Sequence, residues 1–460
     1  MKQRFLHLYY TLLGKLAKHY LRRHQPKIIG INGSVGKTSC RMIIFQTLQQ
    51  FLPNKKISTS PKNFNGELGL SLSILEITER EPKINCFLST LRKCLYKALF
   101  GRKSYDIIVL EYGIDTPNEM EFILNIAKPD IGVFTAIDAV HSEQFGSPDA
   151  IAAEEIKMAL NTKEIVFLNA NDDYAMQLYP RITIDKFTYQ TAASLTPNTK
   201  HKEKKADLRY DNIEFTLHQE KDAKKKIEIK SAFSAFLKGR QYKVETNLLG
   251  KANYGYITLA LVIAEILSGK AIANDNEQIK TTYKLQPGRM SFFAGKYDTL
   301  ILDSTYNAAP RSMREVINTA IQIRSQLFPQ REIWLILGDM RELGDFTEQE
   351  HRKLAGYVSQ SSDQLFLLGT SMTKFLADEL EKIWFDLKKL HLTKKREKLN
   401  DELDSLLKSK QKNEEPPILV FKGSQNTIFL EESVKYFLQD ASDQQYLTRQ
   451  SSFRLQKKQN

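Results

Sequence analysis

The segment KIIGINGSVGKTSC, residues 27–40, constrains the fold more than any other part of the chain. Its first five residues form an apolar run typical of a buried strand, and Lys37-Thr38 opens a stretch with helical periodicity. Gly30 lies within the run, and Gly33 and Gly36 lie between the run and the helical stretch. A strand that turns through glycines into a helix presents backbone N–H groups and the positive helix end to an anion. The segment therefore predicts a phosphate-binding loop at the edge of a parallel sheet.

The residues of this loop have predicted tasks. Lys37 supplies a full positive charge, and the Thr38 hydroxyl is placed to bind a Mg²⁺ ion that bridges phosphates. The alternative is a chance glycine-rich turn, against which the preceding strand and the Lys-Thr pair argue. The common spelling G-x-x-x-x-G-K-[ST] would place a glycine where this chain has Ile31. The residues predicted to hold the phosphates of ATP are Gly33, Ser34, Val35, Gly36, Lys37, Thr38 and Ser39.

Short apolar runs that alternate with helical patterns predict an α/β fold. In the first half they are residues 27–31, 105–113, 130–137 and 164–169. Continuous runs suit strands buried on both faces of a parallel sheet. Residues 207–246 alternate with period two instead, which predicts an antiparallel hairpin added to that sheet.

A second series of apolar runs follows Pro287 and Gly288, which punctuate the chain. Its members are residues 296–304, 332–340, 363–369 and 416–424. Repeated alternation of strands and helices again indicates a parallel sheet, so we expect two α/β domains. The predicted layout is an amphipathic basic helix over 1–25, a central P-loop ATPase domain over 26–286, a smaller Rossmann-like domain over 287–440 and a flexible basic tail over 441–460.

The composition is that of a globular protein with anionic partners. The 460 residues carry a formal net charge of +13. A positive charge favours binding of nucleotides, acidic metabolites, nucleic acid or an anionic membrane surface. The alternative is that the lysine-rich surface only keeps the protein soluble. Three cysteines without metal-ligand spacing fit a reducing cytosol, and no secretory signal or membrane span is evident, so we expect a cytoplasmic protein. The apolar stripe of the N-terminal helix fits packing on its own domain, with weak membrane-surface contact left open.

Two residues at the ends of predicted strands are candidate metal ligands. Glu111 follows a buried strand, where a carboxylate can reach a metal held over the loop. His141 follows the next strand, in the same crevice of the sheet. A lone histidine is more often a structural residue, but the position of His141 beside Thr38 and Glu111 favours a role in metal binding.

Taken together, these motifs resemble the Mur ligases, whose loop is written G-x-[TN]-G-[TS]-x-G-K-[ST]. GINGSVGKTS follows this spelling, including the missing glycine. The chain is most similar to the branch that adds D-alanyl-D-alanine to a UDP-muramoyl tripeptide. The other matching segments are NFNGELG (63–69), HSEQFGS (141–147), LLGKANYGYITLA (248–260), PGRM (287–290), DSTYNAAPRSM (303–313), GDMRELG (338–344) and KGS (422–424).

The resemblance implies roles for individual residues. It places His141 on a second Mg²⁺ ion, Asn253 at the adenine, Arg289 at the γ-phosphate and Asp303 near the ribose. Further residues are implied to line the substrate side of the closed cleft: Asn63, Asn65, Glu67, Tyr306, Asn307 and His351. The implied catalytic residues are Lys37, Glu111, His141 and Arg289, and the implied metal ligands are Thr38, Glu111, His141 and Glu155.

The chain departs from the family pattern in three places. The uridine-binding domain that precedes the loop in full-length members has no counterpart in residues 1–25. The family's carbamylated lysine is matched by Glu155, with Lys157 two residues on, and either side chain could serve in its place. Tyr256 replaces the second asparagine of the adenine segment.

The resemblance implies an ATP-dependent amide ligase that uses ATP and Mg²⁺, acts on small molecules as a monomer and binds no nucleic acid. One alternative is another ligase of the same superfamily, of the folylpolyglutamate or cyanophycin synthetase type. The spellings NFNGELG, YNAAP and GDMRELG argue against it. A second alternative is a basic P-loop ATPase that binds nucleic acid or membrane, although the sequence shows no aromatic stacking platform or helicase motif.

Overall fold

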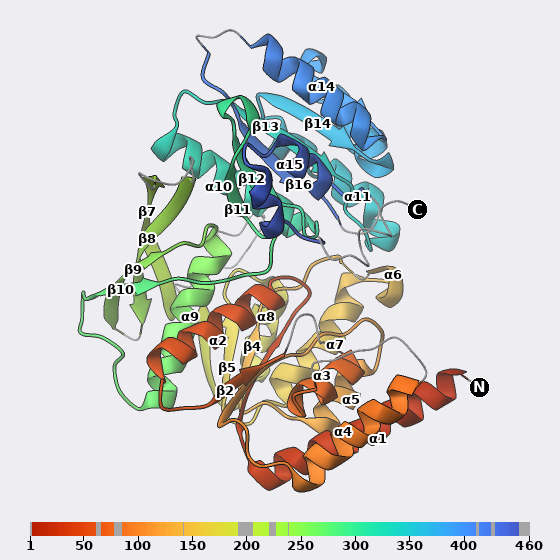
Figure 1. Ribbon diagram of the computed structural model, residues 1–460, viewed down its shortest axis with the longest axis vertical. Helices are drawn as coiled ribbons and strands as arrows, with labels where there is room; N and C mark the ends of the chain where they lie inside the picture. Colours follow the sequence, from red (N-terminus) through yellow and green to blue (C-terminus); the bar gives the residue numbers. More distant parts are fainter. Residues whose placement is uncertain are drawn as a thin grey trace.

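The computed structural model describes residues 2–60, 66–77, 85–140, 142–191, 206–219, 227–237, 239–410, 414–424 and 428–449. Figure 1 shows two α/β lobes stacked along the long axis, with the C-terminal lobe above the central lobe. The chain passes from the first sheet to the second between Thr281 and Ser291. No helix within the described residues combines the length and the apolar character that a bilayer-crossing segment needs.

The central lobe contains a ten-stranded sheet in the order β10-β9-β8-β7-β6-β5-β4-β1-β3-β2. Strands β1 to β6 run parallel, and their buried positions are continuous in β1, β3, β4 and β5, as the apolar runs predict. The bounds of the six are β1 Lys27–Asn32, β2 Ile57–Thr59, β3 Ile107–Glu111, β4 Ile131–Phe134, β5 Ile165–Asn169 and β6 Asp185–Tyr189.

The predicted hairpin is a three-stranded antiparallel extension of this sheet. It consists of β7 Leu208–Gln219, β8 Ile227–Leu237 and β9 Arg240–Thr246. Strand β10 Gln278–Thr281 returns parallel to β9 at the outer edge. Helix α9 Lys251–Ser268 crosses the extension and packs against α2 Lys37–Phe51, the helix that follows the loop.

Helices cover both faces of the central sheet because alternate strand residues point to opposite sides. Ile29 and Ile31 of β1 pack with α2 and α9, whereas Ile28 packs with the helices of the other face. Those helices are α1 Lys2–His24, α3 Gly66–Ile74, α4 Asn85–Phe100 and α5 Glu119–Ile126, and beside them lie α6 Ser142–Phe145, α7 Pro148–Leu160 and α8 Asp173–Leu178.

The C-terminal lobe contains a six-stranded sheet in the order β11-β12-β16-β13-β14-β15, parallel except at β11. Its strands are β11 Ser291–Ala294, β12 Leu300–Ser304, β13 Ile333–Gly338, β14 Gln364–Leu368, β15 Leu390–Thr393 and β16 Ile418–Lys422. Its helices are α10 Pro310–Leu327, α11 Thr347–Arg352, α12 Ala355–Val358, α13 Ala377–Lys382, α14 Arg396–Ser409 and α15 Glu431–Phe437. The predicted α/β fold class is confirmed.

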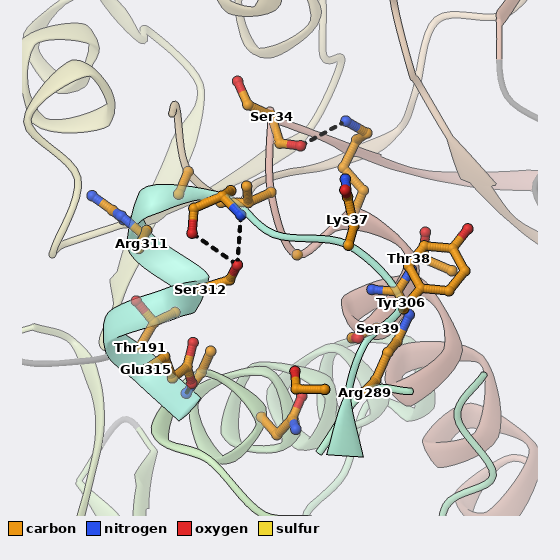
Figure 2. Close-up of a pocket in the computed structure, with 18 of the residues that line it drawn as sticks. Ser34, Lys37, Thr38, Ser39, Thr191, Arg289, Tyr306, Arg311, Ser312 and Glu315 are labelled. Atoms are coloured by element: carbon orange, nitrogen blue, oxygen red, sulfur yellow. Dashed lines mark hydrogen bonds between the residues drawn. The ribbon is translucent and has the colours of Figure 1, made fainter. Parts of the chain in front are cut away.

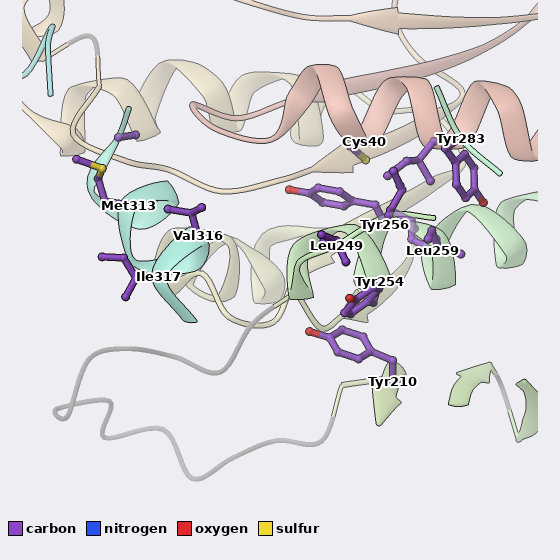
Figure 3. Packing of buried hydrophobic residues seen from close by; sticks show 14 of the residues in the cluster. Cys40, Tyr210, Leu249, Tyr254, Tyr256, Leu259, Tyr283, Met313, Val316 and Ile317 are labelled. Atoms are coloured by element: carbon purple, nitrogen blue, oxygen red, sulfur yellow. The ribbon is translucent and has the colours of Figure 1, made fainter. Parts of the chain in front are cut away.

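One apolar cluster crosses from the central lobe into the C-terminal lobe. It joins Leu249 and Tyr254, at the start of α9, to Met313, Val316 and Ile317 on α10. Figure 3 shows these side chains together with Cys40 of α2 and Tyr256 of α9. The two lobes therefore share part of their interior.

The last three described residues are buried, so the prediction of a flexible tail from residue 441 does not hold for residues 447–449. A short 3₁₀ helix, Ala441–Tyr446, leads to Leu447, Thr448 and Arg449, and all three are buried. Leu447 fills the apolar face of the C-terminal lobe, and Arg449 forms an ion pair with Glu431. Residues 450–460 lie outside the described residues.

Candidate active site

A cavity of about 530 Å³ lies between the two lobes. The central lobe contributes the glycine loop and the C-terminal ends of β3, β5 and β6, and the C-terminal lobe contributes the start of α10 and the segment before β11. In Figure 2, Ser34 and Lys37 face Arg311 and Ser312 across this opening, and Arg289 and Tyr306 lie beside Thr38. Carboxyl ends of parallel strands commonly form ligand sites in α/β folds.

Two glycines are required by the close packing of the loop. Gly33 has φ +118°, and a Cβ there would lie 2.3 Å from Oγ1 of Thr135. Gly36 has φ +87°, and a Cβ there would lie 2.1 Å from the hydroxyl of Tyr256. L-residues with side chains rarely adopt either conformation. Glycine is therefore required at these two positions by the backbone conformation of the loop and by its contacts with Thr135, after β4, and Tyr256 of α9.

Neighbouring backbone fixes the path of the loop. The N–H of Ser34 donates to the carbonyl of Ala136 at 2.7 Å, and the Thr135 hydroxyl donates to the carbonyl of Val35 at 2.7 Å. Helix α2 begins at Lys37, and the residue before it, Gly36, has no side chain to cap the first N–H groups. A helix N-terminus with free N–H groups attracts phosphate.

Lys37 is folded back over the loop that precedes it. Its Nζ donates to the carbonyl of Gly33 and, at 3.3 Å, to that of Ser34. The side chain is buried and lines the cavity. The side chain therefore reaches the cavity next to the loop, where it can meet an anion, which is the role predicted for it.

Glu111 accepts hydrogen bonds from Thr38 and from Arg41, a residue that was not predicted from the sequence. The Thr38 hydroxyl donates to Oε1 of Glu111 at 3.2 Å, and Nε of Arg41 donates to Oε2 at 3.3 Å. Burial lowers the pKa of Arg41, and Glu111 opposes that shift. Thr38 and Glu111 form a pair of adjacent oxygen donors, the kind that Mg²⁺ uses together with phosphate oxygens and water.

Glu155 supports the loop from below. Its Oε2 accepts from Nδ2 of Asn32 at 2.9 Å and from the N–H of Gly33 at 3.1 Å. Burial raises the pKa of this carboxyl, and Lys37 opposes that shift. These hydrogen bonds show that Glu155 supports the loop, and its role as a metal ligand stays a prediction. Lys157 pairs with Glu154 at 2.7 Å and is half-exposed.

Arg289 reaches the cavity from the segment that joins the two sheets. Its guanidinium carbon lies 4.2 Å from the centre of the Tyr306 ring, an arrangement that orients a cation over an aromatic face. Within the described part of the chain its Nε is buried without a hydrogen-bond partner. A buried donor without a partner is unfavourable, so this group suits an incoming anion.

Asp303 is buried under the motif and is not among the residues that line the cavity, so its contact with a ribose stays a prediction. Its Oδ1 accepts from the N–H and the hydroxyl of Thr305 at 2.9 and 2.7 Å. Desolvation by burial raises the pKa of its carboxyl to about 6. Tyr306 and Asn307, one and two residues beyond that turn, do line the cavity, as predicted.

His351 is buried and is not among the residues that line the cavity, so its role in substrate binding stays a prediction. It is fully buried on α11, where Nε2 accepts from the N–H of Met340 at 3.2 Å and Nδ1 faces the carbonyl of Thr347. Burial lowers its pKa, which fits a neutral ring with one donor and one acceptor. The resemblance supplied this assignment, and burial was not visible in the motif.

The remaining predicted residues divide into three groups. Asn253 lines the cavity and donates to the carbonyl of Leu249 at 2.7 Å, and Tyr256 lines it under Gly36. Glu67 is half-buried at the start of α3 and is not among the residues that line the cavity. Asn63, Asn65 and His141 lie outside the described residues.

Several cavity residues were not singled out from the sequence. Lys422 is buried at the end of β16, where its Nζ donates to the carbonyls of Ser304 and Asn307. Burial lowers the pKa of Lys422 to about 7. The KGS match was a signal for this residue, although we assigned it no role. The others include Asn169, Asn171, Thr191, Lys251, Arg311 and Glu315.

The two lobes cap each other's helices beside the cavity. Glu315 of α10 accepts from the N–H of Ala252, in the first turn of α9, at 2.8 Å. Asp138 of the central lobe accepts from the N–H of Arg311, in the first turn of α10, at 3.0 Å. Carboxylates at helix N-termini satisfy free N–H groups and the helix dipole. The arrangement fixes the positions of the two lobes on either side of the cavity.

Within the described ranges, no group of three or more His, Cys, Asp or Glu side chains is placed to hold a metal ion. Of the described residues, Thr38 and Glu111 are the adjacent oxygen donors that a magnesium ion at this site would use together with the phosphates.

Comparison with known proteins shows what this architecture is similar to. Residues 31–264 match the Mur ligase middle domain, and residues 288–425 match the Mur ligase, glutamate ligase domain. The MurF crystal structure from Acinetobacter baumannii superposes with a TM-score of 0.69 at 20% identity, over 92% of this chain and 79% of that one. The MurF ligase from Thermotoga maritima in complex with ADP gives 0.64 at 20% identity, over 92% and 82%.

Two named relatives are similar in sequence. The UDP-N-acetylmuramoyl-tripeptide–D-alanyl-D-alanine ligase of Bacillus subtilis (strain 168) is 25% identical over 92% of this chain and 79% of its own length. The protein of the same name from Borreliella burgdorferi is 27% identical over 78% of this chain and 65% of its own length. The chain thus spans 79% of the length of the first relative and 65%, just under two thirds, of the second. With both domain patterns matched over most of its length, the chain belongs to the Mur ligase family.

Proposed function

We propose that this chain is an ATP-dependent ligase that joins D-alanyl-D-alanine to the terminal carboxylate of a UDP-muramoyl tripeptide. One observation carries the proposal: the phosphate loop of the central lobe and Arg289 of the C-terminal lobe face the same cavity. The names of the relatives supply the substrates. ATP and Mg²⁺ are the cofactors that this loop suits, because Thr38 and Glu111 offer adjacent oxygen donors.

The chemistry requires a carboxylate to become electrophilic. Its oxygen attacks the γ-phosphorus of ATP, the bond to the β-phosphate oxygen breaks, and ADP leaves. The amine of D-alanyl-D-alanine then attacks the carbonyl carbon of the acyl phosphate. Phosphate departs with the electrons of its C–O bond, and the nitrogen loses a proton. The first step brings two anions together, so positive charge must be concentrated around them.

The residues of this chain meet that demand from two sides. Lys37 and the N-terminus of α2 face the phosphates from the central lobe, and Arg289 faces them from the C-terminal lobe. Magnesium bound near Thr38 and Glu111 would add Lewis-acid charge neutralisation. Burial of the cavity between two lobes keeps water from an acyl phosphate, which water would otherwise hydrolyse. Small molecules are the proposed partners, with a monomer in solution and no nucleic acid bound.

The test is phosphate release from ATP with UDP-muramoyl tripeptide, measured with and without D-alanyl-D-alanine. We expect release only when both are present, together with a product heavier by one dipeptide less one water. Folate with glutamate is the matched control for the rival ligase type. Turnover with that pair, and none with the muramoyl substrate, would replace the proposal with the rival; stimulation by DNA would favour the nucleic-acid ATPase.

A further inference from the structure

Helices α1 and α4 form an exposed apolar surface on the far side of the central lobe from the C-terminal lobe (Figure 1). The two helices run side by side in the same direction. The Tyr9 hydroxyl donates to the carbonyl of Phe87 at 3.1 Å, and Nη1 of Arg23 donates to that of Leu99 at 2.6 Å. The exposed apolar residues that define this α1/α4 face are Leu8, Leu12, Leu88, Leu95, Tyr96, Leu99 and Phe100.

These exposed side chains lie on the side of each helix that does not pack against the central lobe. The opposite side of α1 buries Leu13, Ala17 and Tyr20 against the central lobe, as the sequence predicted. Tyr96 and Phe100, one helical turn apart, are each 69% exposed, and their ring centres lie 5.9 Å apart. Large exposed apolar patches on monomeric proteins mark interaction sites more often than chance exposure.

The two helices of this face carry basic residues and no acidic ones. Residues 2–24 and 85–104 carry 11 of the 67 Lys and Arg residues of the chain and none of its 54 Asp and Glu residues. The rest of the chain is therefore nearly neutral, and the surplus that produces the net charge of +13 is concentrated here. Lys15, Arg22 and Arg92 are among its exposed cations, whereas Lys97 and Lys103 pair with acids at its border, Glu76 and Asp106.

We propose that the α1/α4 face docks on an anionic lipid bilayer, with the two helices lying in the membrane interface. Leucines and aromatic rings that project between basic side chains are the composition of interfacial helices. The basic charge of the face also favours a lipid surface over a second copy of the chain as its partner. A second copy of this chain on the same face would oppose basic residues with basic residues, which disfavours self-association. An anionic lipid surface complements both the charge and the apolar side chains.

Docking in this orientation leaves the cavity accessible. The α1/α4 face and the cavity lie on opposite sides of the central lobe, so bound lipid would contact neither the glycine loop nor Arg289. The inference does not depend on the proposed ligase activity, because no residue of the face belongs to the cavity. Substitutions there should leave turnover in solution unchanged.

The first test is co-sedimentation of the full chain with phosphatidylcholine vesicles, with and without phosphatidylglycerol. We expect binding only to the anionic vesicles and its loss at high salt, where charges are screened. Lys15→Gln/Arg22→Gln/Arg92→Gln should weaken binding by about tenfold or more. The matched control, Lys388→Gln/Lys394→Gln/Lys398→Gln, removes three exposed lysines of the C-terminal lobe and should bind like the wild type.

The second test separates insertion from simple charge attraction. Tyr96→Glu/Phe100→Glu should abolish binding at low salt, whereas Trp384→Glu, at a 93% exposed residue of the other lobe, should not. In a Trp384→Phe background, Phe100→Trp should give fluorescence that shifts to the blue and is quenched by brominated lipid. Failure of the wild type to bind anionic vesicles, or equal binding of the triple variant, would overturn the proposal. So would a dimer that Tyr96→Glu/Phe100→Glu disperses, since the face would then bind protein.

Discussion

Arg449 and Glu431 form a fully buried bidentate ion pair at the end of the described chain. Nε and Nη2 of Arg449 donate to the two carboxylate oxygens of Glu431 at 2.8 and 2.7 Å. The same guanidinium donates to the carbonyls of Thr305 and Tyr306 at 2.7 and 3.0 Å. The pair thereby connects the last segment of the chain to the loop whose Tyr306 ring supports Arg289.

Arg449→Met should therefore destabilise the protein and weaken ATP binding together. Removal of one partner leaves the Glu431 charge buried and alone, which costs about 3–5 kcal/mol. Chemical denaturation measures the loss, and Glu431→Met/Arg449→Met should recover part of it because no charge is left unpaired. The KM for ATP should rise in the single variant, since the Tyr306 loop loses two hydrogen bonds. An unchanged unfolding midpoint for Arg449→Met would contradict this role.

Lys37→Ala should reduce turnover by at least about a hundredfold, the usual effect of losing a group that stabilises transferring charge. Its Nζ contacts only carbonyls of the loop, so the fold should remain intact by circular dichroism. ATP-dependent phosphate release measures the effect. Release at the wild-type rate would refute the assignment of this loop to ATP.

Glu155→Ala should raise the KM for ATP roughly tenfold, because it removes the acceptor that holds Nδ2 of Asn32 and the N–H of Gly33 and so loosens the loop. Lys157→Ala is the matched control and should be silent, because that lysine pairs with Glu154. Activity should also be independent of bicarbonate. If depletion of carbon dioxide inactivates the wild type and Lys157→Ala mimics it, a carbamylated lysine is at work instead.

Lys422 should take up a proton when ATP binds near pH 8. Burial lowers its pKa to about 7, so much of it is neutral at that pH until an anion in the cavity raises the pKa again. Calorimetry in buffers of different ionisation enthalpy measures the uptake, which Lys422→Met should abolish.

The lowered pKa of Lys422 also affects stability. Because its pKa in the folded protein lies below the ordinary value of 10.5, the unfolded chain binds more protons between these two pH values. The contribution of Lys422 to stability should therefore improve as pH rises from about 7 to about 10.5.

Much of the fold could be predicted because continuous apolar runs identify buried parallel strands without further information. Strands β1, β3, β4 and β5 of the first sheet, and β12, β13, β14 and β16 of the second, coincide with such runs. The strands that we missed, β2, β6, β10, β11 and β15, are three to five residues long and most mix polar with apolar residues. Such short segments carry too little periodicity to separate strand from loop.

Site residues could be predicted where the backbone conformation requires a particular residue type. They could not be predicted where the role of a residue depends on contacts with residues distant in the sequence. Gly33 and Gly36 are fixed by conformation, and Lys37 follows from the loop. Arg449 was not predictable, because a polar tail gives no sign that one guanidinium will find Glu431. His351 was assigned from its motif, although its two hydrogen bonds serve the loop around Met340. Both depend on burial, which a single sequence does not reveal.

The apolar cluster shared by α9 and α10 has a consequence for folding. Since Val316 and Ile317 of one half belong to the same buried cluster as Leu249 and Tyr254 of the other, and α10 packs against β7, severing the chain between the halves would expose apolar surface on each fragment. Calorimetric melting of the intact protein should give one endotherm rather than two. Fragments ending at residue 286 and beginning at 287, produced separately, should aggregate, and co-expression should rescue both.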